Sequence, residues 1–500
     1  MTAQDFIHKW RNVKLTERSA SQQHFLDLCA LVDHPTPAAV DKTGEAFTFE
    51  RGAKKRADEL VSTQNGWADV WKKGFFAWEY KGPHKDLGKA YQQLQQYRED
   101  LENPPLLVVS DMDRIVIHTN FTATPVEVRE IPLAGLGDPD NLAVLHALFH
   151  DPEKLRPGQT SERITAKAAG RLADLAQSIR ARGCEPRSVA RFLDRLVFCL
   201  FAEDIRLLPP GLFTDLLDKT HDEPAKFAKY TGQLFEAMAH GGDFLLQEIL
   251  HFNGNLFSDC EVLELTPDEL SMLHETAQLD WSAIDPSIFG TLFERGMDPG
   301  KRSQLGAHYT SREDIETLIE PVVMLPLRRE WCEVRTAVEH LLVTGRKATK
   351  DTLDRARDQR EVIAPDPPAR KPAKGTRTKA RGEAWRILGR FHERLYHLTV
   401  LDPACGSGNF LYVTLQKLKD LEKQVIVYAG DKLSERFIPM VGPWQLYGIE
   451  LSPYAYDLAQ MTVWIGYLQW TRANGFGITQ TPVLRPMEHN FQCRDAILDW

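Results

Sequence analysis

No run of about eighteen apolar residues occurs in this 500-residue sequence, so it predicts no membrane-spanning helix. The first residues, MTAQD, lack the charged and then apolar layout of a signal peptide. The seven cysteines are scattered, odd in number and free of C-x-x-C pairs, which argues against a disulfide framework and a structural zinc site. We therefore expect a cytoplasmic protein with no membrane partner.

Two phosphate-binding motifs are also missing. No G-x-x-x-x-G-K-[ST] segment occurs, so an ATP-driven motor is not expected. The G-x-G-x-x-G pattern of NAD-binding proteins is absent as well, because Gly406-Ser407-Gly408 continues into Asn409.

Basic residues are fewer than acidic residues in this sequence. Lysine and arginine number 61 against 70 acidic residues, which gives a net charge of −9. Proteins that neutralise phosphates are usually basic where they touch DNA, so composition alone does not indicate a nucleic-acid partner. Basic segments can still gather on one face. With 43% hydrophobic and 26% charged residues the chain is typical of a globular protein, and its length indicates about two to four domains.

Hydrophobic periodicity divides the chain into three parts. Residues 1–145 combine an initial helix with short strands, and residues 146–300 are almost entirely helical in pattern. Residues 301–500 contain a strand–turn–helix rhythm in their later part. Within this third part, residues 345–383 are polar and basic and predict a disordered insertion, which could be a solvated linker or an arm that contacts phosphates.

The segment LTVLDPACGSGNFL at 398–411 is the sharpest local pattern, an apolar strand that runs into a small-residue turn and a helix over 410–421. Gly406 and Gly408 have no Cβ, so the backbone can turn tightly against a ligand, and amides at the helix start can donate hydrogen bonds. The string resembles motif I of amino-methylating DNA methyltransferases, whose loop wraps the methionine part of S-adenosylmethionine. The resemblance implies these cofactor-binding residues: Asp402, Pro403, Ala404, Gly406, Gly408, Asn409 and Phe410.

Two acids follow at strand ends. Glu450 ends the strand 444–450 and precedes the helix 453–470, a position suited to accepting hydrogen bonds from ribose hydroxyls, although alone it would be a surface residue. Its distance from Gly408 exceeds that of a minimal Rossmann unit, so residues 420–442 would be an insertion. Asp495 fits the strand end where related enzymes contact adenine, with a solvent-exposed loop as the alternative.

An upstream segment, LGAHYTS at 305–311, precedes a predicted helix over 312–323, for which Thr310 or Ser311 would be a natural N-cap. It resembles motif X, the G-x-x-Y-T segment that precedes motif I in the γ arrangement and covers the cofactor. This implies cofactor roles for Tyr309 and Thr310. His308 fits a packing or hydrogen-bonding role better than a catalytic one.

The catalytic tetrapeptide of such enzymes is missing. Methylation of an exocyclic amine requires groups that accept its protons and stack on a flipped base, supplied there by [Asn/Asp/Ser]-Pro-Pro-[Tyr/Phe]. The only Asn-Pro-Pro, at 103–105, is followed by Leu106 and predicts a turn into a strand. In the γ order the tetrapeptide would come after Asp495, so we expect it, with the DNA-recognition region, in a further region or chain beyond residue 500.

A second constellation lies in WADVWKKGFFAWEYK at 67–81. Glu79 and Lys81 are two residues apart on a predicted strand and therefore share a face. A three-residue turn over 72–74, with glycine in the left-handed conformation, would place Asp69 opposite Ala77 and diagonally beside Glu79. Two carboxylates can bind Mg²⁺, and a neighbouring ammonium can help to orient an attacking water, which is the chemistry of phosphodiester hydrolysis.

The spacing of Asp69, Glu79 and Lys81 resembles the PD-(D/E)xK nucleases, in the form found at the N-terminus of single-chain type IIG (type IIL) restriction-modification enzymes. Gln93 and Tyr97, on a predicted helix over 87–101, match the Q-x-x-x-Y pattern of some of these nucleases. Glu17, on the N-terminal helix, could complete the metal site. Because E-x-K is frequent by chance, a degenerate or structural remnant remains the alternative.

We therefore expect a multidomain α/β protein: a PD-(D/E)xK nuclease domain over 1–145, an all-α helical spacer over 146–300, and the start of a Rossmann-like class I methyltransferase domain over 301–500. The resemblance implies N6-adenine methylation of double-stranded DNA with S-adenosylmethionine, together with Mg²⁺-dependent cleavage, in restriction and modification. One alternative is a methylation-only enzyme of antiphage defence whose nuclease-like domain does not cut. The other is a non-catalytic subunit that binds DNA or cofactor.

Overall fold

The computed structural model describes residues 1–11, 13, 17–51, 68–82, 85–252, 256–287, 310–366, 373–477 and 483–498, with the side chains of 17–19 left out. Unit 1 comprises residues 1–165, 282–284 and 471–477, and unit 2 comprises 166–281, 285–470 and 478–500. Across these described ranges no helix is both long and apolar enough to traverse a bilayer.

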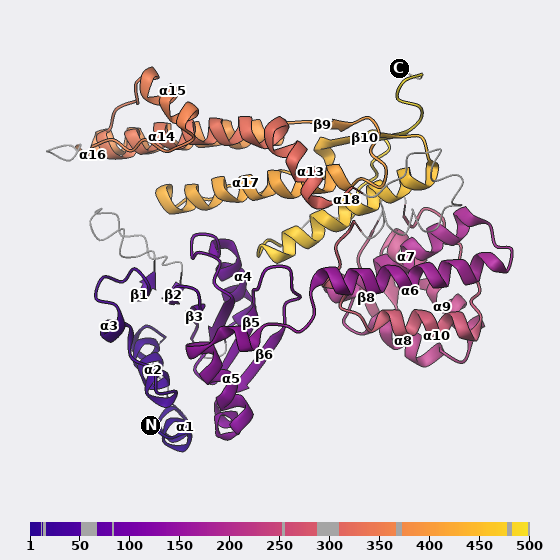
Figure 1. The fold of residues 1–500 in the computed structure, drawn as a ribbon, viewed down its shortest axis with the longest axis horizontal. Coiled ribbons are helices and arrows are strands. Elements are labelled where there is room, and N and C mark those ends of the chain that lie inside the picture. Colours follow the sequence, from indigo (N-terminus) through magenta and orange to yellow (C-terminus); the bar gives the residue numbers. More distant parts are fainter. Residues whose placement is uncertain are drawn as a thin grey trace. The chain divides into compact units, whose positions relative to one another are not determined.

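Unit 1 is built on a six-stranded sheet whose strands are paired in chain order (Figure 1). Its third and fourth strands are parallel and every other neighbouring pair is antiparallel. The parallel pair is joined by a crossover helix, α4 (Leu87–Tyr97), as parallel strands require. The strands are β1 (Phe47–Arg51), β2 (Ala68–Lys72), β3 (Phe76–Tyr80), β4 (Leu106–Ser110), β5 (Arg114–Thr119) and β6 (Val128–Pro132).

The core of unit 1 is aromatic and lies on one face of the sheet. Alternate residues of β3, Phe76, Trp78 and Tyr80, enter it and are fully buried. They pack with Phe25 and with Phe149, which come from two of the helices that supply the rest of this core. These helices are α1 (Ala3–Trp10), α2 (Glu17–Leu31) and α5 (Pro139–His150). The other β3 residues face the side of the sheet that α4 covers.

Along the chain, the elements from residue 161 to residue 277 are mainly helical. The helix α7 is buried along most of its length, and Pro186 occupies its first turn, where no amide hydrogen is required. A short hairpin of β7 (Gly242–Phe244) and β8 (Gln247–Ile249) interrupts the helices, so the expected all-α spacer is wrong there. Gly241 and Gly242 both have positive φ, which ends the preceding helix and starts the hairpin. The helices are α6 (Ser161–Ala181), α7 (Pro186–Asp204), α8 (Leu212–Thr220), α9 (Pro224–His240) and α10 (Pro267–Ala277).

Long helices dominate the remainder of unit 2. The helix predicted over 312–323 instead ends at Ile319 and continues through one π turn, because Pro321 cannot donate to the regular ladder. Figure 1 shows α16 running beside α14 and α17, and both pairs are in contact. The helices are α13 (Arg312–Ile319), α14 (Leu325–Thr344), α15 (Lys350–Gln359), α16 (Lys374–Tyr396), α17 (Asn409–Leu433) and α18 (Pro453–Ala473).

The prediction of a disordered insertion over 345–383 is wrong for two stretches, which form α15 and the start of α16. Both helices pack against α14, and the small side chains of Ala356 and Ala380 are buried. Lysine, arginine and alanine are strong helix formers, and each of these two stretches buries one alanine. Residues 367–372 lie outside the described residues.

The second sheet consists of β9 (Val400–Asp402), β10 (Leu446–Glu450) and β11 (Phe491–Cys493), all parallel, in the order β11-β10-β9. The helix α17 follows β9 and α18 follows β10, so each strand leads into a crossover helix. The expected insertion over 420–442 is largely the continuation of α17, which reaches Leu433 instead of ending at residue 421. The carboxyl ends of β9 and β10 therefore meet at one edge, where the motif I loop begins.

Candidate functional site

The turn between β9 and α17 has the tight geometry expected of the motif I loop. Gly406 has φ +53° and Gly408 has φ +84°, a conformation that side-chain-bearing residues rarely adopt. A Cβ atom at Gly408 would lie 2.9 Å from both the Cα and the carbonyl oxygen of Ala459 in α18, whereas a Cβ at Gly406 would meet nothing within 4 Å. Gly408 is therefore required both for its backbone conformation and for the approach of α18.

Glu450 holds this loop to the neighbouring strand. Its Oε2 accepts a hydrogen bond from the Gly406 amide at 2.9 Å, and its Oε1 accepts one from the Ser452 amide at 2.8 Å. Across the sheet, Asp402 stands beside Gly448 in register, and its Oδ1 accepts from the Ala404 amide at 3.0 Å. Burial raises the pKa of Asp402, the Ala404 amide opposes this, and the negative charge of Glu450 adds to it. The two predicted acids thus meet at the loop.

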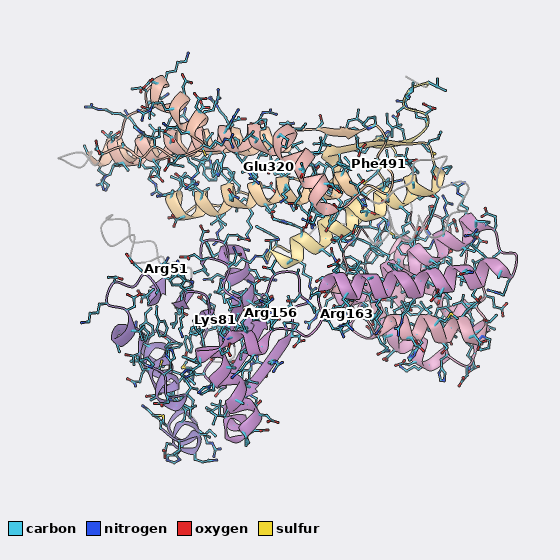
Figure 2. The ribbon with its side chains drawn as sticks, viewed as in Figure 1. Arg51, Lys81, Arg156, Arg163, Glu320 and Phe491 are labelled. Carbon is cyan, nitrogen blue, oxygen red and sulfur yellow. The ribbon has the colours of Figure 1, made fainter. Side chains whose placement is uncertain are left out.

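A close packing contact beneath the loop was not predicted. A Cβ at Gly448 would lie 2.7 Å from the Phe491 ring and 2.8 Å from the Cys405 Sγ, so the middle strand must carry glycine there. The Cys405 amide donates to the Ile449 carbonyl at 3.0 Å and ties the loop to β10. The signal was available, since a glycine inside a strand often marks a close approach. Figure 2 labels Phe491 at the start of β11.

Asn409, the first residue of α17, carries an unsatisfied acceptor. Its side chain is 8% exposed, and its Oδ1 has no hydrogen-bond partner among the described residues. A buried acceptor without a donor costs about 1–3 kcal/mol, which a ligand with an N–H or O–H group could recover. Together with the glycine-lined loop, this orphan oxygen fits a ligand such as S-adenosylmethionine. Beside it Phe410 is half-buried, and Pro403 and Ala404 are exposed.

Asp495 follows β11 and shapes its own turn, since its Oδ1 accepts from the amides of Ile497 at 2.8 Å and Leu498 at 3.1 Å. The preceding Arg494 amide donates to the Glu450 carbonyl at 3.1 Å, so this turn begins at the same sheet edge. The end of β11 therefore lies at the same sheet edge as the motif I loop. The Asp495 carboxylate itself accepts hydrogen bonds from backbone amides of its own turn.

Thr310 is half-buried and directly precedes Ser311, whose hydroxyl caps α13 by accepting from the Asp314 amide at 3.2 Å. The helix lies on α17, because Arg312 donates to the Gln416 Oε1 at 2.7 Å. The expected motif X helix is thus adjacent to the motif I helix. Tyr309 and His308 lie outside the described residues.

In unit 1 the strands β2 and β3 bring the predicted nuclease residues together, in a register that differs from the predicted one. The turn covers residues 73–75, with Gly74 at φ +72°, and pairs Trp71 with Ala77 and Val70 with Trp78. The expected pairing of Asp69 with Ala77 is therefore wrong. The turn begins one residue later than predicted, and continuing the register places Asp69 directly opposite Glu79.

The polar contacts of these residues converge on Glu79, which is 6% exposed. Its Oε1 accepts from the Lys81 Nζ at 2.6 Å and from the Gln93 Nε2 of α4 at 3.0 Å. Asp69 accepts from the Tyr80 amide at 2.7 Å through Oδ2. Lys81, labelled in Figure 2, follows the end of β3. Lys81 and Gln93 thus meet at Glu79, and Asp69 contacts the amide of the neighbouring Tyr80.

The predicted metal ligands Asp69 and Glu79 lie in the described part of the chain. No group of three histidine, cysteine, aspartate or glutamate side chains in the described part of the chain could hold a metal ion. The side chain of Glu17 is outside that part. Asp69 and Glu79 remain two hard oxygen ligands on one face, a donor set that suits Mg²⁺.

Sequence reasoning missed a buried polar pair on the opposite face of β3. The Tyr80 hydroxyl and the His24 Nδ1 lie 2.9 Å apart, and His24 is 1% exposed. Burial lowers the pKa of His24 to about 3, partly offset by Asp27, and burial raises the pKa of Tyr80 well above its usual value. Both groups are therefore neutral, and the pair anchors the strand that carries Glu79.

Three family models match the chain in order. The MmeI N-terminal domain matches residues 1–182, the MmeI helicase spacer domain 187–257, and the MmeI DNA-methyltransferase domain 376–498. DNA methyltransferase A of Bacillus subtilis (strain 168) is 26% identical over 396 residues, which cover 76% of this chain and 39% of that protein.

A solved structure is also similar. The type IIL restriction-modification enzyme MmeI, in complex with DNA, has a TM-score of 0.52 and 26% identity, and the match covers 66% of this chain and 40% of that one. The chain thus spans about two fifths of the length of both relatives.

Proposed function

Because the chain belongs to the MmeI family of type IIG and IIL restriction-modification enzymes, we propose that it binds S-adenosylmethionine for N6-adenine methylation of double-stranded DNA and carries a Mg²⁺-dependent nuclease site. The glycine-lined loop between β9 and α17, with the unsatisfied Asn409 oxygen at its end, carries the cofactor half of the proposal.

The cofactor would be held by residues at the edge where β9, β10 and β11 end. Asp402 and Asn409 offer carboxylate and amide oxygens to the amino end of the ligand, and Gly408 lets the backbone lie against it. Glu450 offers its carboxylate to ribose hydroxyls, and Asp495 stands where adenine would lie. When bound, S-adenosylmethionine supplies an activated methyl group; the residues of this loop orient it and exclude water.

Calorimetry with S-adenosylmethionine tests this assignment. We expect Asp402→Ala and Glu450→Gln each to weaken binding at least tenfold, because each removes an acceptor that also orders the loop. The control is Glu393→Gln, an exposed acid on α16. Equal affinity in wild type, Asp402→Ala and Glu450→Gln would overturn the cofactor site.

For the nuclease half, support comes from the shared contacts of Glu79. Lys81 and Gln93 both donate to one of its oxygens, and the register sets Asp69 opposite. The two carboxylates would hold Mg²⁺, which would activate water at the scissile phosphate, while the Lys81 ammonium balances charge beside them. Double-stranded DNA is the substrate we propose, as in the MmeI complex.

Plasmid cleavage in Mg²⁺ tests the nuclease separately. We expect Glu79→Gln to reduce cleavage at least a hundredfold, and the exposed Glu130→Gln in the same sheet to retain it. Cleavage by Glu79→Gln at the wild-type rate would show that the assigned site is wrong. A wild-type protein that methylates DNA without cleaving it would identify the methylation-only alternative.

A further inference from the structure

Within unit 2, a cavity of about 370 Å³ lies between α7 and α18. This volume falls in the range of small-molecule sites in proteins. Its wall combines charged, amide and aromatic side chains, and no role in the methyltransferase site uses it. The side chains that bear on the argument are Asp194, Gln460, Asp457, Phe198, Tyr456 and Trp464.

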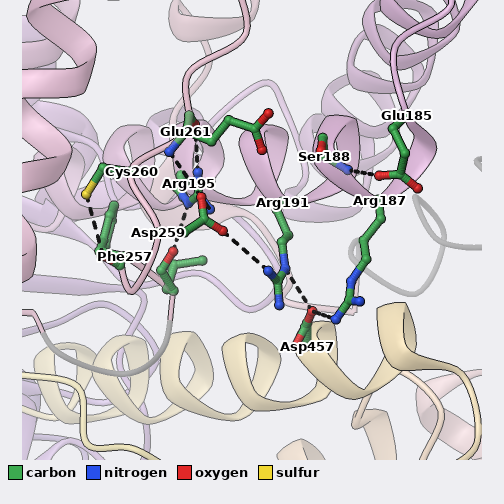
Figure 3. A network of polar contacts seen from close by, with 11 residues as sticks. Glu185, Arg187, Ser188, Arg191, Arg195, Phe257, Asp259, Cys260, Glu261 and Asp457 are labelled. Atoms are coloured by element: carbon green, nitrogen blue, oxygen red, sulfur yellow. Dashed lines mark hydrogen bonds and ion pairs between the residues drawn. The ribbon is translucent and has the colours of Figure 1, made fainter.

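The rim of the cavity is a network of ion pairs (Figure 3). Arg191 of α7 lies 3.2 Å from Asp457 of α18 and 3.3 Å from Asp259, and Arg187 lies 4.0 Å from the same Asp457 oxygen. Arg195, 3% exposed at its side chain, donates to the carbonyls of Leu256 at 2.8 Å and Glu261 at 2.7 Å and pairs with Asp259 at 2.9 Å. The three arginines therefore already have acceptors within the protein. Their charges do not call for a bound anion in the cavity.

Asp194 is the exception in this wall. It is 4% exposed, lines the cavity, and makes no hydrogen bond or ion pair with the described residues. Burial raises its pKa, and the nearby Asp457 charge raises it further, with a larger effect than the opposing charge of either Arg195 or Arg191. A carboxylate in this position is stabilised by an added positive charge and destabilised by an added negative one.

A second acceptor in the wall has no donor. Gln460 is 6% exposed; its amide nitrogen donates to the Tyr456 carbonyl at 3.3 Å, but its Oε1 has no hydrogen-bond partner among the described residues. A buried acceptor without a donor costs about 1–3 kcal/mol, so a ligand that carries an N–H group would recover the Gln460 oxygen.

Aromatic side chains complete the wall. Phe198, Tyr456 and Trp464 line the same cavity, and Trp464 is 3% exposed, with its indole nitrogen engaged at the Arg485 carbonyl. Aromatic faces attract organic cations, by about 0.5–2 kcal/mol for each favourable contact. A wall that combines side-chain oxygen acceptors with aromatic rings favours binding of an organic cation that carries an apolar stem. It suits a hydrated metal ion less well.

We propose that this cavity is a binding site for a small organic cation of the alkylguanidinium or alkylammonium class, whose charged end hydrogen-bonds to Asp194 and Gln460. The stem lies against the rings of Trp464 and Phe198. The site is separate from the proposed methyl transfer, and its occupancy bridges the helical spacer and the helix that follows Glu450.

Calorimetry with n-butylguanidinium, and with n-butylurea as its neutral isostere, tests the proposal on the whole chain with S-adenosylmethionine at saturation. We expect one saturable site for n-butylguanidinium and at least tenfold weaker binding of n-butylurea. Asp194→Asn, which keeps the shape of the side chain, should lose at least tenfold in affinity, and Gln460→Met several-fold. The exposed Asp215→Asn on α8 is the matched control and should bind as wild type does.

Saturable binding of the cation in Asp194→Asn at wild-type affinity would overturn the proposal, as would the absence of saturable binding in the wild type or a preference for n-butylurea. Unfolding midpoints of both variants, compared with the control, separate loss of the ligand from loss of the fold. Gln460→Met serves as the second variant, because it removes the orphan oxygen without touching charge.

Discussion

Replacement of Gly408 by alanine should destabilise unit 2 far more than the same change two residues earlier. Both glycines have positive φ, +84° at Gly408 and +53° at Gly406, so each alanine carries a backbone cost of about 1–2 kcal/mol. They differ in what the added methyl group meets. At Gly406 it meets nothing within 4 Å, whereas at Gly408 it meets backbone atoms of Ala459 at 2.9 Å.

The magnitude follows from that difference. Backbone atoms inside α18 cannot give way as the end of a flexible side chain can, so the helix must shift, and overpacking of this kind costs about 1–3 kcal/mol. The gain from a stiffer unfolded chain is common to both alanine variants and cancels in the comparison. We therefore expect Gly408→Ala to lower the free energy of unfolding by about 2–5 kcal/mol, and Gly406→Ala by about 1–2 kcal/mol.

Urea unfolding followed by tryptophan fluorescence measures both variants, and hydrogen exchange of α17 and α18 amides shows where stability is lost. The two helices flank the contact, so their protection should fall in Gly408→Ala and stay close to wild type in Gly406→Ala. Equal losses in the two variants would refute the argument, since the approach of Ala459 would then contribute nothing.

Three further outcomes follow from the described contacts. Burial holds the pKa of His24 at about 3 in the folded protein, so as pH falls below about 6.5 the histidine takes up a proton in the unfolded chain before it does so in the folded one. The contribution of His24 to the free energy of unfolding is therefore fully present above that pH and falls by about 2 kcal/mol between pH 7 and 5. His24→Gln should remove that part of the slope in urea titrations; an unchanged slope would contradict it. Gln93→Leu should lower Mg²⁺-dependent cleavage about tenfold without changing methylation, since it removes a donor to Glu79; unchanged cleavage would show no such role. Ala356→Glu should unfold α15 locally, seen as lost amide protection, unlike Asp354→Glu on its exposed side.

Local structure could be read from the sequence wherever one physical constraint decided it. Strand alternation placed Glu79 and Lys81, and the two glycines at 406 and 408 required a tight strand-to-helix turn. The helices α15 and α16 could not be read in the same way. Their polar composition suggested disorder, yet Ala356 of α15 and Ala380 near the start of α16 are buried, and both helices pack on α14. The sequence does not show such long-range partners.

The groups with the least local pattern were the ones that sequence reasoning missed. Gln460 matters because its buried Oε1 has no donor among the described residues, which depends on elements far away in the chain. His24 is similar, because its low pKa comes from its burial beside Tyr80, 56 residues further along. The sequence shows that a residue is an acid or a histidine. Which hydrogen bonds that residue makes depends on how the chain packs around it.

The register of β2 and β3 shows how a one-residue difference in a turn bears on chemistry. Side chains directly opposite on antiparallel strands have Cβ atoms about 4.5–5.5 Å apart, whereas diagonal neighbours are about 7–8 Å apart. The predicted turn put Asp69 and Glu79 on a diagonal. Continuing the register that follows the observed turn over 73–75 puts them opposite one another. Two carboxylates at the shorter spacing can share one small cation and repel each other without it. We therefore expect the stability of unit 1 to rise on Mg²⁺ addition, and this rise to disappear in Glu79→Gln. A rise that survives in the variant would place the ion elsewhere.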